Sequence, residues 1–353
     1  EKKLAIYNVY IITVPTPVKN NKPDLRKIKQ ASKIVAKNLK QNDIVIYEST
    51  VYPGLSEELC KNVLEKISCL KLNKDFYLGY SPERINLGDK KHNIKNIKKI
   101  VSGSNKLTLS KIDNLYKSII LAGTYKAQSI KIAEAAKVIE NTQRDLNIAF
   151  MNELSFIFSK MKINIYDVLT AAKTKWNFLN FEPGLVGGHC IGVDPYYLTH
   201  KSQKLGYNPK MILAGRKIND SVGKTVSKKF KKELNKIQSS KTKKVLIMGF
   251  AFKENIADIR NSKVYDIFKE LKKSKYKLDV FDPEVNNLDV KNLYKIKLIK
   301  YPKINFYDGI IVAVKHDIFY KMGLKKINSF RKKNSILYDL KNLFPNNKNL
   351  LMF

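Results

Sequence analysis

Short apolar runs alternate with amphipathic helical stretches in the first eighty residues, and this alternation constrains the fold more than any other feature. Three runs read as buried strands, at 9–15, 44–50 and 76–80. Helical periodicity lies between them at 24–40, where Asp24 is a suitable N-cap, and at 55–67. Alternation of strands and helices predicts a parallel α/β sheet.

Polar residues follow the predicted strands at their carboxyl ends, where parallel sheets bind ligands. Thr16 follows the first strand, Thr50 ends the second, and Ser81-Pro82-Glu83-Arg84 follows the third. Thr50 either holds a water molecule or caps the next helix. Glu83 is either a general base or a solvated loop carboxylate, and Arg84 is suited to a phosphate or an acyl amide.

The middle of the chain is helical. One helical stretch runs from 127 to 160, and a second, which carries Arg216, runs from about 195 to 235. The loop at 176–193 between them is rich in Gly, Phe and Pro.

A lysine-rich linker at 239–244 opens a second α/β unit. Its strands are predicted at 245–249, 277–283 and 309–314. The expected fold class is therefore α/β, with two parallel-sheet domains joined by a central helical domain. The expected domains are 1–122, 123–238 and 239–353.

Composition limits the kind of protein and its compartment. The 353 residues suffice for two or three domains, and no apolar run reaches the length of a membrane span. The first residues lead directly into a strand, so no signal peptide is expected. Three cysteines without a C-x-x-C spacing fit the reducing cytoplasm. With four scattered histidines, a metal site is not expected.

The net charge of +36 raises the question of a nucleic-acid partner. The lysines are spread along helix faces and do not surround a recognised nucleic-acid motif. We therefore expect no specific nucleic-acid partner, although the charge should attract polyanions nonspecifically.

One motif is absent from the sequence. A dinucleotide-binding domain opens with strand–GxGxxG–helix, and no GxGxxG occurs in this chain. The chain begins at Glu1 on what reads as a middle strand. This predicts that two βα steps, on the order of 60 residues, are missing from the first domain.

Cys190 lies in the motif Gly187-Gly188-His189-Cys190-Ile191-Gly192-Val193-Asp194-Pro195. A lone cysteine is more often structural, but glycines before it allow a ligand to approach the backbone closely. A thiolate with a lowered pKa is a strong nucleophile. Asp194 follows closely, and Lys137 and Asn141 share one helix face. A Lys beside an Asn amide stabilises a developing oxyanion, so this set of residues favours chemistry on a carbonyl. The spacing of Lys137 and Asn141 is equally compatible with two polar residues that face solvent.

An anion site is indicated in the second α/β unit, where Gly249–Ser262 links a strand to a helix. Lys253 and Arg260 in this segment are suitable partners for phosphate or carboxylate groups.

Taken together, the motifs resemble the UDP-glucose/UDP-N-acetylhexosamine 6-dehydrogenase family over essentially the whole chain. The matching motifs are VPTP at 14–17, ESTVYPG at 48–54, YSPERIN at 80–86, EAAKVIENTQRDLNIAFMNE at 134–153, PGLVGGHCIGVDPYYL at 183–198 and GFAFKENIADIRNS at 249–262. SPERIN and GGHCIGVDPYYL are most similar to the branch of the Vi-antigen type, which oxidises UDP-N-acetylglucosamine.

The resemblance implies Rossmann-like domains and a four-electron oxidation of a sugar C6 alcohol by two NAD⁺, for surface polysaccharide synthesis. It implies that Cys190 is the nucleophile, that Lys137 and Asn141 hold the C6 oxygen, and that Asp194 assists the base and water network. It implies further roles for other residues: Glu83 and Thr50 in thioester hydrolysis, Thr16, Thr50 and Arg260 at NAD, and Glu83, Arg84, Lys137, Asn141, Leu179, Asn180, Phe181, Gly187, Lys253 and Arg216 at the UDP-sugar.

The resemblance also implies a homodimer formed through the central helices, with Arg216 reaching the substrate of the neighbouring subunit. Gly192-Val193-Asp194 replaces the Pro-Lys-Asp of UDP-glucose dehydrogenases, which favours an N-acetylhexosamine. Three alternatives stay open: UDP-N-acetylmannosamine or UDP-glucose as the substrate, a truncated remnant that binds UDP-sugar without catalysis, and a basic nucleic-acid-binding protein.

Overall fold

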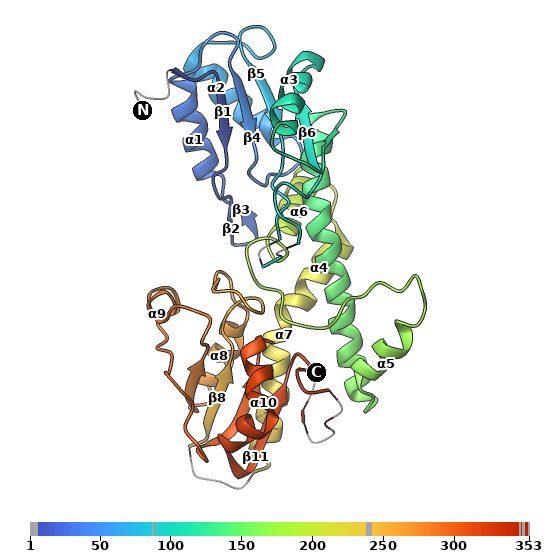
Figure 1. Ribbon diagram of the computed structural model, residues 1–353, viewed down its shortest axis with the longest axis vertical. Coiled ribbons are helices and arrows are strands. Elements are labelled where there is room, and N and C mark those ends of the chain that lie inside the picture. Colours follow the sequence, from blue (N-terminus) through green and yellow to red (C-terminus); the bar gives the residue numbers. More distant parts are fainter. Residues whose placement is uncertain are drawn as a thin grey trace. The chain divides into compact units, whose positions relative to one another are not determined.

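The structure is a computed structural model and describes residues 6–86, 88–89, 91–237, 242–345, 347 and 350–351. The chain divides into two compact units (Figure 1). Unit 1 contains the described residues up to Gln143 together with Val193–Ile212. Unit 2 contains Arg144–Gly192 together with the described residues from Leu213 onward.

Unit 1 is built on a five-stranded sheet in the order β1-β4-β5-β6-β7. Its strands are β1 (Val9–Ile12), β4 (Ile44–Tyr47), β5 (Tyr77–Tyr80), β6 (Lys99–Gly103) and β7 (Thr124–Lys126). All neighbours are parallel except β5 and β6. The short hairpin β2 (Val18–Lys19) and β3 (Lys22–Pro23) follows β1. The three strands predicted first are confirmed, whereas β6 and β7 were not predicted.

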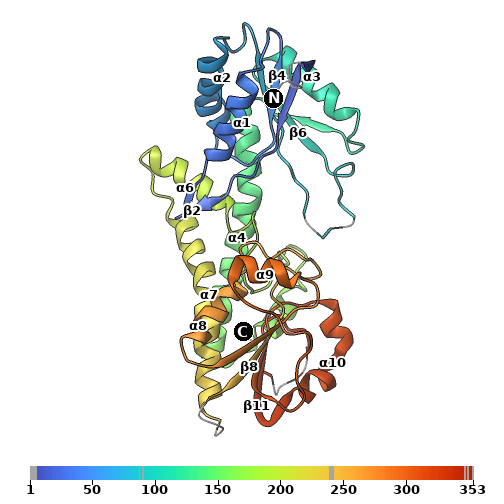
Figure 2. The ribbon, with the colours of Figure 1, turned by 90° about the vertical axis from the view of Figure 1, so that its left-hand side faces the viewer.

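Helices cover both faces of this sheet. Figure 2 shows α1 (Arg26–Ala36) and α2 (Lys61–Ser68) on one face and α3 (Lys106–Lys117) on the other. Strand β4 explains this arrangement, because its side chains alternate between two cores. Val45 and Tyr47 pack with the α1 and α2 side, and Ile44 and Ile46 pack with the α3 side. A strand that is buried on both faces reads as a continuous apolar run.

The start of the first helix differs from the prediction. Helix α1 begins at Arg26, and its N-cap is Leu25 rather than Asp24. The Asp24 carboxylate accepts the backbone N–H of Arg26 at 3.1 Å and pairs with the guanidinium of the same residue. Asp24 therefore closes a local turn before the helix. The predicted helix at 55–67 is present as a π-helical turn, η2 (Ser56–Cys60), that continues into α2.

The central region contains four helices: α4 (Ile130–Lys160), α5 (Ile165–Ala172), α6 (Asp194–Lys204) and α7 (Lys210–Asn235). The single helical stretch predicted from 195 to 235 is in fact α6 and α7. Gly206, with φ +84°, and Pro209 separate them, because neither residue continues a helix at that point. Among the described helices, none is both long and apolar enough to cross a membrane.

Unit 2 contains a parallel sheet in the order β11-β10-β8-β9. Its strands are β8 (Lys244–Met248), β9 (Lys277–Phe281), β10 (Tyr307–Val312) and β11 (Arg331–Asp339). The connecting helices are α8 (Val264–Lys272), α9 (Asn287–Tyr294) and α10 (Asp317–Ser329). The three predicted strands are confirmed, and β11 was not predicted.

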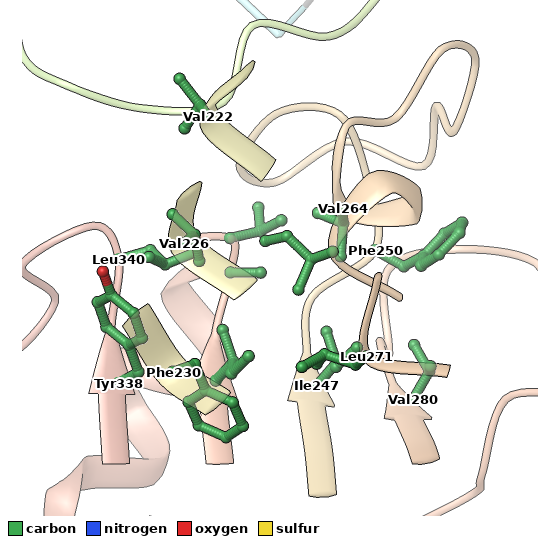
Figure 3. Close-up of a cluster of buried hydrophobic side chains, with 14 of the residues drawn as sticks. Val222, Val226, Phe230, Ile247, Phe250, Val264, Leu271, Val280, Tyr338 and Leu340 are labelled. Carbon is green, nitrogen blue, oxygen red and sulfur yellow. The ribbon is translucent and has the colours of Figure 1, made fainter. Parts of the chain in front are cut away.

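Figure 3 shows how α7 packs on this sheet. Val226 and Phe230 of α7 lie beside Tyr338 of β11. Ile247 of β8 and Val280 of β9 belong to the same core. The helix comes so close to β10 that a Cβ on Gly309 would lie 2.6 Å from the Phe230 ring. The opposite face packs against α10, which Figure 2 shows on the other side of the sheet from α8.

The predicted fold class is confirmed: the chain is α/β, with parallel-sheet Rossmann-like domains and a central helical region. The predicted domain limits at residues 122 and 238 stay predictions.

Candidate active site

The Cys190 turn lies in unit 2 and is held against the segment that follows β8. Gly188 has φ +80°, and a Cβ there would lie 2.7 Å from the Phe252 ring. The Asn261 amide donates to the Gly188 carbonyl at 3.0 Å. Cys190 itself is half-buried and forms no disulfide. The glycines are therefore required by a close approach of two chain segments, and they leave the thiol accessible.

Charged groups from the same segment surround the turn. The Asp258 carboxylate pairs with the Arg260 guanidinium, with Nε at 3.0 Å from each oxygen. The Asp258 hydrogen bond raises the pKa of Arg260, and the negative charges of Asp258 and of a Cys190 thiolate act in the same direction. His189 Nδ1 lies 4.0 Å from Asp258. The segment held against the Cys190 turn therefore carries a paired cation and anion, Arg260 and Asp258, and the Arg260 charge interacts with Cys190.

A cavity of about 170 Å³ opens beside this turn, entirely within unit 2. Residues after β8 and β10 form part of its wall, as the carboxyl ends of adjacent parallel strands meet at one edge. Four basic residues line it: Arg144, Lys253, Lys263 and Lys341. Gly187 and Ile191, which flank Cys190 in the sequence, line it as well. The concentration of Lys and Arg suits an anionic ligand such as a diphosphate.

A second polar cluster lies in unit 1. Asn141 on α4 donates through Nδ2 to Asp194 Oδ2 at 2.6 Å, and Lys137, one turn earlier on the same helix, is buried. Burial raises the pKa of Asp194 to about 6, while the Lys137 charge and the Asn141 hydrogen bond lower it. Lys137 and Asn141 are therefore not solvent-facing residues, and the predicted set of Lys137, Asn141 and Asp194 is brought together.

The loop after β5 is tied to α4. Glu83 Oε1 accepts the backbone N–H groups of Arg84 and Ile85, both at 2.6 Å. The Arg84 guanidinium contacts Glu140 Oε1 at 2.6 Å and donates to the Lys98 carbonyl at 2.8 Å. These bonds fix the loop next to the helix turn that carries Asn141, and they use much of the bonding capacity of Arg84 within the protein.

Comparison with protein-family models then identifies the group of proteins. Residues 1–120 match the NAD binding domain, 131–221 the central domain and 246–346 the UDP binding domain of the UDP-glucose/GDP-mannose dehydrogenase family. The chain belongs to this family. NAD is accordingly its cofactor.

Two curated relatives of this dehydrogenase are UDP-N-acetyl-D-glucosamine 6-dehydrogenases. The protein of Salmonella typhi is 55% identical over 98% of this chain and 81% of its own length. The protein of Pseudomonas aeruginosa is 55% identical over 97% of this chain and 81% of its own length. A solved UDP-D-ManNAc dehydrogenase from Pyrococcus horikoshii is 26% identical with a TM-score of 0.88, covering 99% of this chain and 81% of that one.

The expectation that part of the first domain is missing is not borne out, because the family's NAD binding domain matches residues 1–120.

The carboxyl edge of the unit 1 sheet brings Thr16 and Thr50 together. Thr16 Oγ1 donates to the Thr50 carbonyl at 2.7 Å, and the Tyr197 hydroxyl donates to the Thr16 carbonyl at 2.6 Å. The buried Glu134 accepts the N–H of Ser56 at 3.0 Å and fixes the segment after Thr50. Thr16 and Thr50 therefore stand together at the sheet edge where a dinucleotide binds, and the arrangement fits the cofactor.

Four of the residues that were predicted to bind the UDP-sugar do not line the cavity beside Cys190: Leu179, Asn180, Phe181 and Arg216. Arg216 on α7 is buried, and its guanidinium lies 2.6 Å from Asp145 and 2.6 Å from Asp220 of its own chain. Leu179 and Asn180 are exposed in the loop before the Cys190 turn, and Phe181 packs against the unit 2 core. These three residues are not part of the cavity wall described above.

Three of the basic residues that line the cavity were not predicted from the sequence: Arg144, Lys263 and Lys341. Lys341 could have been predicted from its position, because it follows a strand at the edge of the sheet where ligands bind. That strand, β11, was not itself predicted. Arg144 lies one turn after Asn141 on the helix that carries the predicted oxyanion residues. Among the described residues, no group of His, Cys, Asp and Glu could hold a metal ion.

Proposed function

We propose that this protein oxidises the C6 alcohol of UDP-N-acetylglucosamine to the carboxylate, with two NAD⁺ per sugar. The observation that carries the proposal is that the Cys190 turn adjoins a cavity lined by basic residues in the UDP binding domain. The two relatives at 55% identity support the N-acetylglucosamine substrate.

The cavity would hold the nucleotide part of the substrate. Lys253, Lys263, Lys341 and Arg144 provide charge for a diphosphate. Gly187 lines the cavity where the Cys190 turn packs on the segment after β8, since a Cβ there would lie 2.8 Å from the Asn261 carbonyl oxygen. We propose that the loop residues Leu179, Asn180 and Phe181 contribute to the same substrate site.

Cys190 would act as the covalent nucleophile. After the first oxidation, its thiolate adds to the C6 aldehyde and forms a thiohemiacetal. The second oxidation converts this into a thioester, and water cleaves the thioester to the carboxylate and the free thiol. NAD⁺ supplies the oxidising power by accepting a hydride in each oxidation. The overall change is an alcohol, two NAD⁺ and one water giving a carboxylate, two NADH and three protons.

Residues of unit 1 would bind the C6 oxygen and exchange protons with it. The Lys137 ammonium and the Asn141 amide stabilise negative charge on this oxygen. Asp194, bonded to Asn141, takes up and returns a proton through water. We propose that Glu83 and Thr50 position the water that cleaves the thioester, that Arg84 steadies this loop at the substrate, and that Thr16 and Thr50 contact NAD. The NAD contact of Arg260 and the substrate contact of Arg216 across a subunit boundary stay predictions.

Activity should depend on the ionisation of Asp194. Its pKa is raised to about 6, so the carboxylate is charged above pH 6 and protonated below it. If the carboxylate is the working form, kcat/KM should fall about tenfold for each pH unit below 6 and level off above it. The measurement is kcat/KM from pH 5 to 8 for the wild type and for Asp194→Asn. An acid limb that stays in place in Asp194→Asn would assign it to another group.

The substrate assignment is tested by counting NADH. Incubation with limiting UDP-N-acetylglucosamine should yield two NADH per sugar and a nucleotide sugar with a C6 carboxylate. The same assay with UDP-N-acetylmannosamine and UDP-glucose should give kcat/KM values lower by about tenfold or more. A higher kcat/KM for either of these would replace the proposed substrate, and one NADH per sugar would rule out the four-electron reaction.

We further propose a homodimer that forms through the central helices. Phe150 and Ile157 lie two turns apart on α4 and are 53% and 46% exposed, which suits a helix face that packs on a partner. Sedimentation equilibrium that gives the monomer mass would contradict the homodimer.

The three thiols, none of which is in a disulfide, support a cytoplasmic reaction. The product would serve surface polysaccharide synthesis.

A further inference from the structure

A buried Asp–His pair lies behind the loop that forms one wall of the cavity. Asp282 follows β9 and His316 precedes α10, and neither side chain is exposed. His316 Nε2 is 3.2 Å from Asp282 Oδ2, and the backbone N–H of Asn255 donates to Nδ1 at 2.9 Å. Because Nδ1 accepts a hydrogen bond, the neutral ring carries its proton on Nε2 and donates it to the carboxylate.

The same carboxylate binds the beginning of the loop. Asp282 Oδ2 also accepts the backbone N–H groups of Phe250 and of Ala251, the latter at 2.9 Å. Asp282 therefore holds the start of the segment 250–255, and His316 holds its end at Asn255. The residues between these anchors, Phe252, Lys253 and Glu254, line the cavity.

Asp282 lies at a position that has a different role in dinucleotide-binding domains. In a dinucleotide-binding domain, an acidic residue at the end of the second strand binds the ribose hydroxyls. Asp282 has that place in the unit 2 sheet, because β9 is the second strand and pairs with β8. Its Oδ2 already accepts bonds from Phe250, Ala251 and His316, and its side chain is buried. The carboxylate is therefore used to hold the loop and is not available to a ribose.

We propose that the Asp282–His316 pair positions the loop 250–255 for nucleotide binding, although neither residue touches the ligand. The inference rests on the proposed function, in which the cavity holds the UDP part of the substrate. A loop that is already fixed loses less conformational entropy when Lys253 and the nearby backbone contact a diphosphate. Loss of the pair should therefore weaken binding of UDP and leave the chemical step intact.

The test is His316→Phe, which keeps a ring of similar size and removes both hydrogen bonds. We expect the Kd for UDP alone, measured by calorimetry, and the KM for the UDP-sugar to rise at least about tenfold. The kcat should stay within about twofold, since the reacting atoms are not contacted. Tyr307→Phe is the matched control. It removes a partly buried hydrogen bond of 2.8 Å to Asp279 of β9, the strand that Asp282 follows.

The outcomes separate the two proposals. Unchanged UDP binding in His316→Phe, or an equal weakening in Tyr307→Phe, would overturn the positioning role alone. Failure of the wild-type protein to bind UDP would overturn the proposed function and this inference with it. If His316→Phe does not fold, His316→Gln keeps one donor and one acceptor with a different reach. Its Kd for UDP should rise about threefold, and an unchanged Kd would overturn the inference.

Discussion

Replacement of Cys190 with Ser should abolish turnover, lowering kcat for NADH formation by about 10³-fold or more. A serine hydroxyl is a weaker nucleophile than a cysteine thiolate and does not form the thioester of the proposed reaction. A cysteine thiol ionises far more readily than a serine hydroxyl, which stays protonated at neutral pH. The measurement is steady-state NADH formation from UDP-N-acetylglucosamine, together with the Kd for UDP, which should not change.

The matched control for this prediction is Cys69→Ser. Cys69 is exposed and lies at the C-terminal end of α2, so its thiol has no part in the proposed reaction. Kinetics of Cys69→Ser should equal those of the wild type. Retention of wild-type kcat by Cys190→Ser would exclude a thioester intermediate and with it the proposed mechanism.

Lys137→Ala should reduce kcat by about 10²- to 10³-fold, because the buried ammonium stabilises charge that develops on the C6 oxygen. The change also removes the positive charge that lowers the pKa of Asp194, so the acid limb of the pH profile should move to higher pH. The Kd for UDP should stay the same, since Lys137 is not among the residues that line the cavity.

Lys131→Ala provides the control on the same helix. Lys131 is exposed, and it lies on α4 before Lys137. Its loss should leave kcat and the pH profile unchanged. If Lys137→Ala instead raised the Kd for UDP and left kcat intact, Lys137 would be a substrate-binding residue without a role in the chemical step.

Much of the fold could be predicted because the strands of a parallel sheet are buried on both faces. The run Ile44–Tyr47 is apolar at every position, and its four side chains divide between two cores. Strand β11 was missed for the opposite reason. It begins Arg331-Lys332-Lys333-Asn334, and only its last residues, Leu337 to Asp339, are buried. Its tertiary pairing with β10, which the local sequence does not encode, makes it a strand.

The candidate site likewise contains residues that could be predicted from the sequence and residues that could not. The helical period places Lys137 and Asn141 on one face, so their common position could be predicted from spacing. The hydrogen bond from Asn141 to Asp194 could not, because Asp194 belongs to another helix, and only the tertiary structure brings these two side chains to 2.6 Å. Lys341 and Lys263 reach the cavity from segments that share no motif with Cys190, so resemblance in short motifs gave no indication of them.

The division of the chain into two units affects the order in which the protein can be completed. The chain passes from one unit to the other after Gln143, Gly192 and Ile212, so each unit is made of two separate stretches. Tyr197 of the later stretch is fully buried in the unit 1 core and holds Thr16 through its hydroxyl. During synthesis, unit 1 therefore lacks part of its core until about sixty further residues beyond Gln143 have been made. Production of unit 1 alone must therefore include α6, for example by joining residues 193–212 through a new linker to the stretch that ends at Gln143.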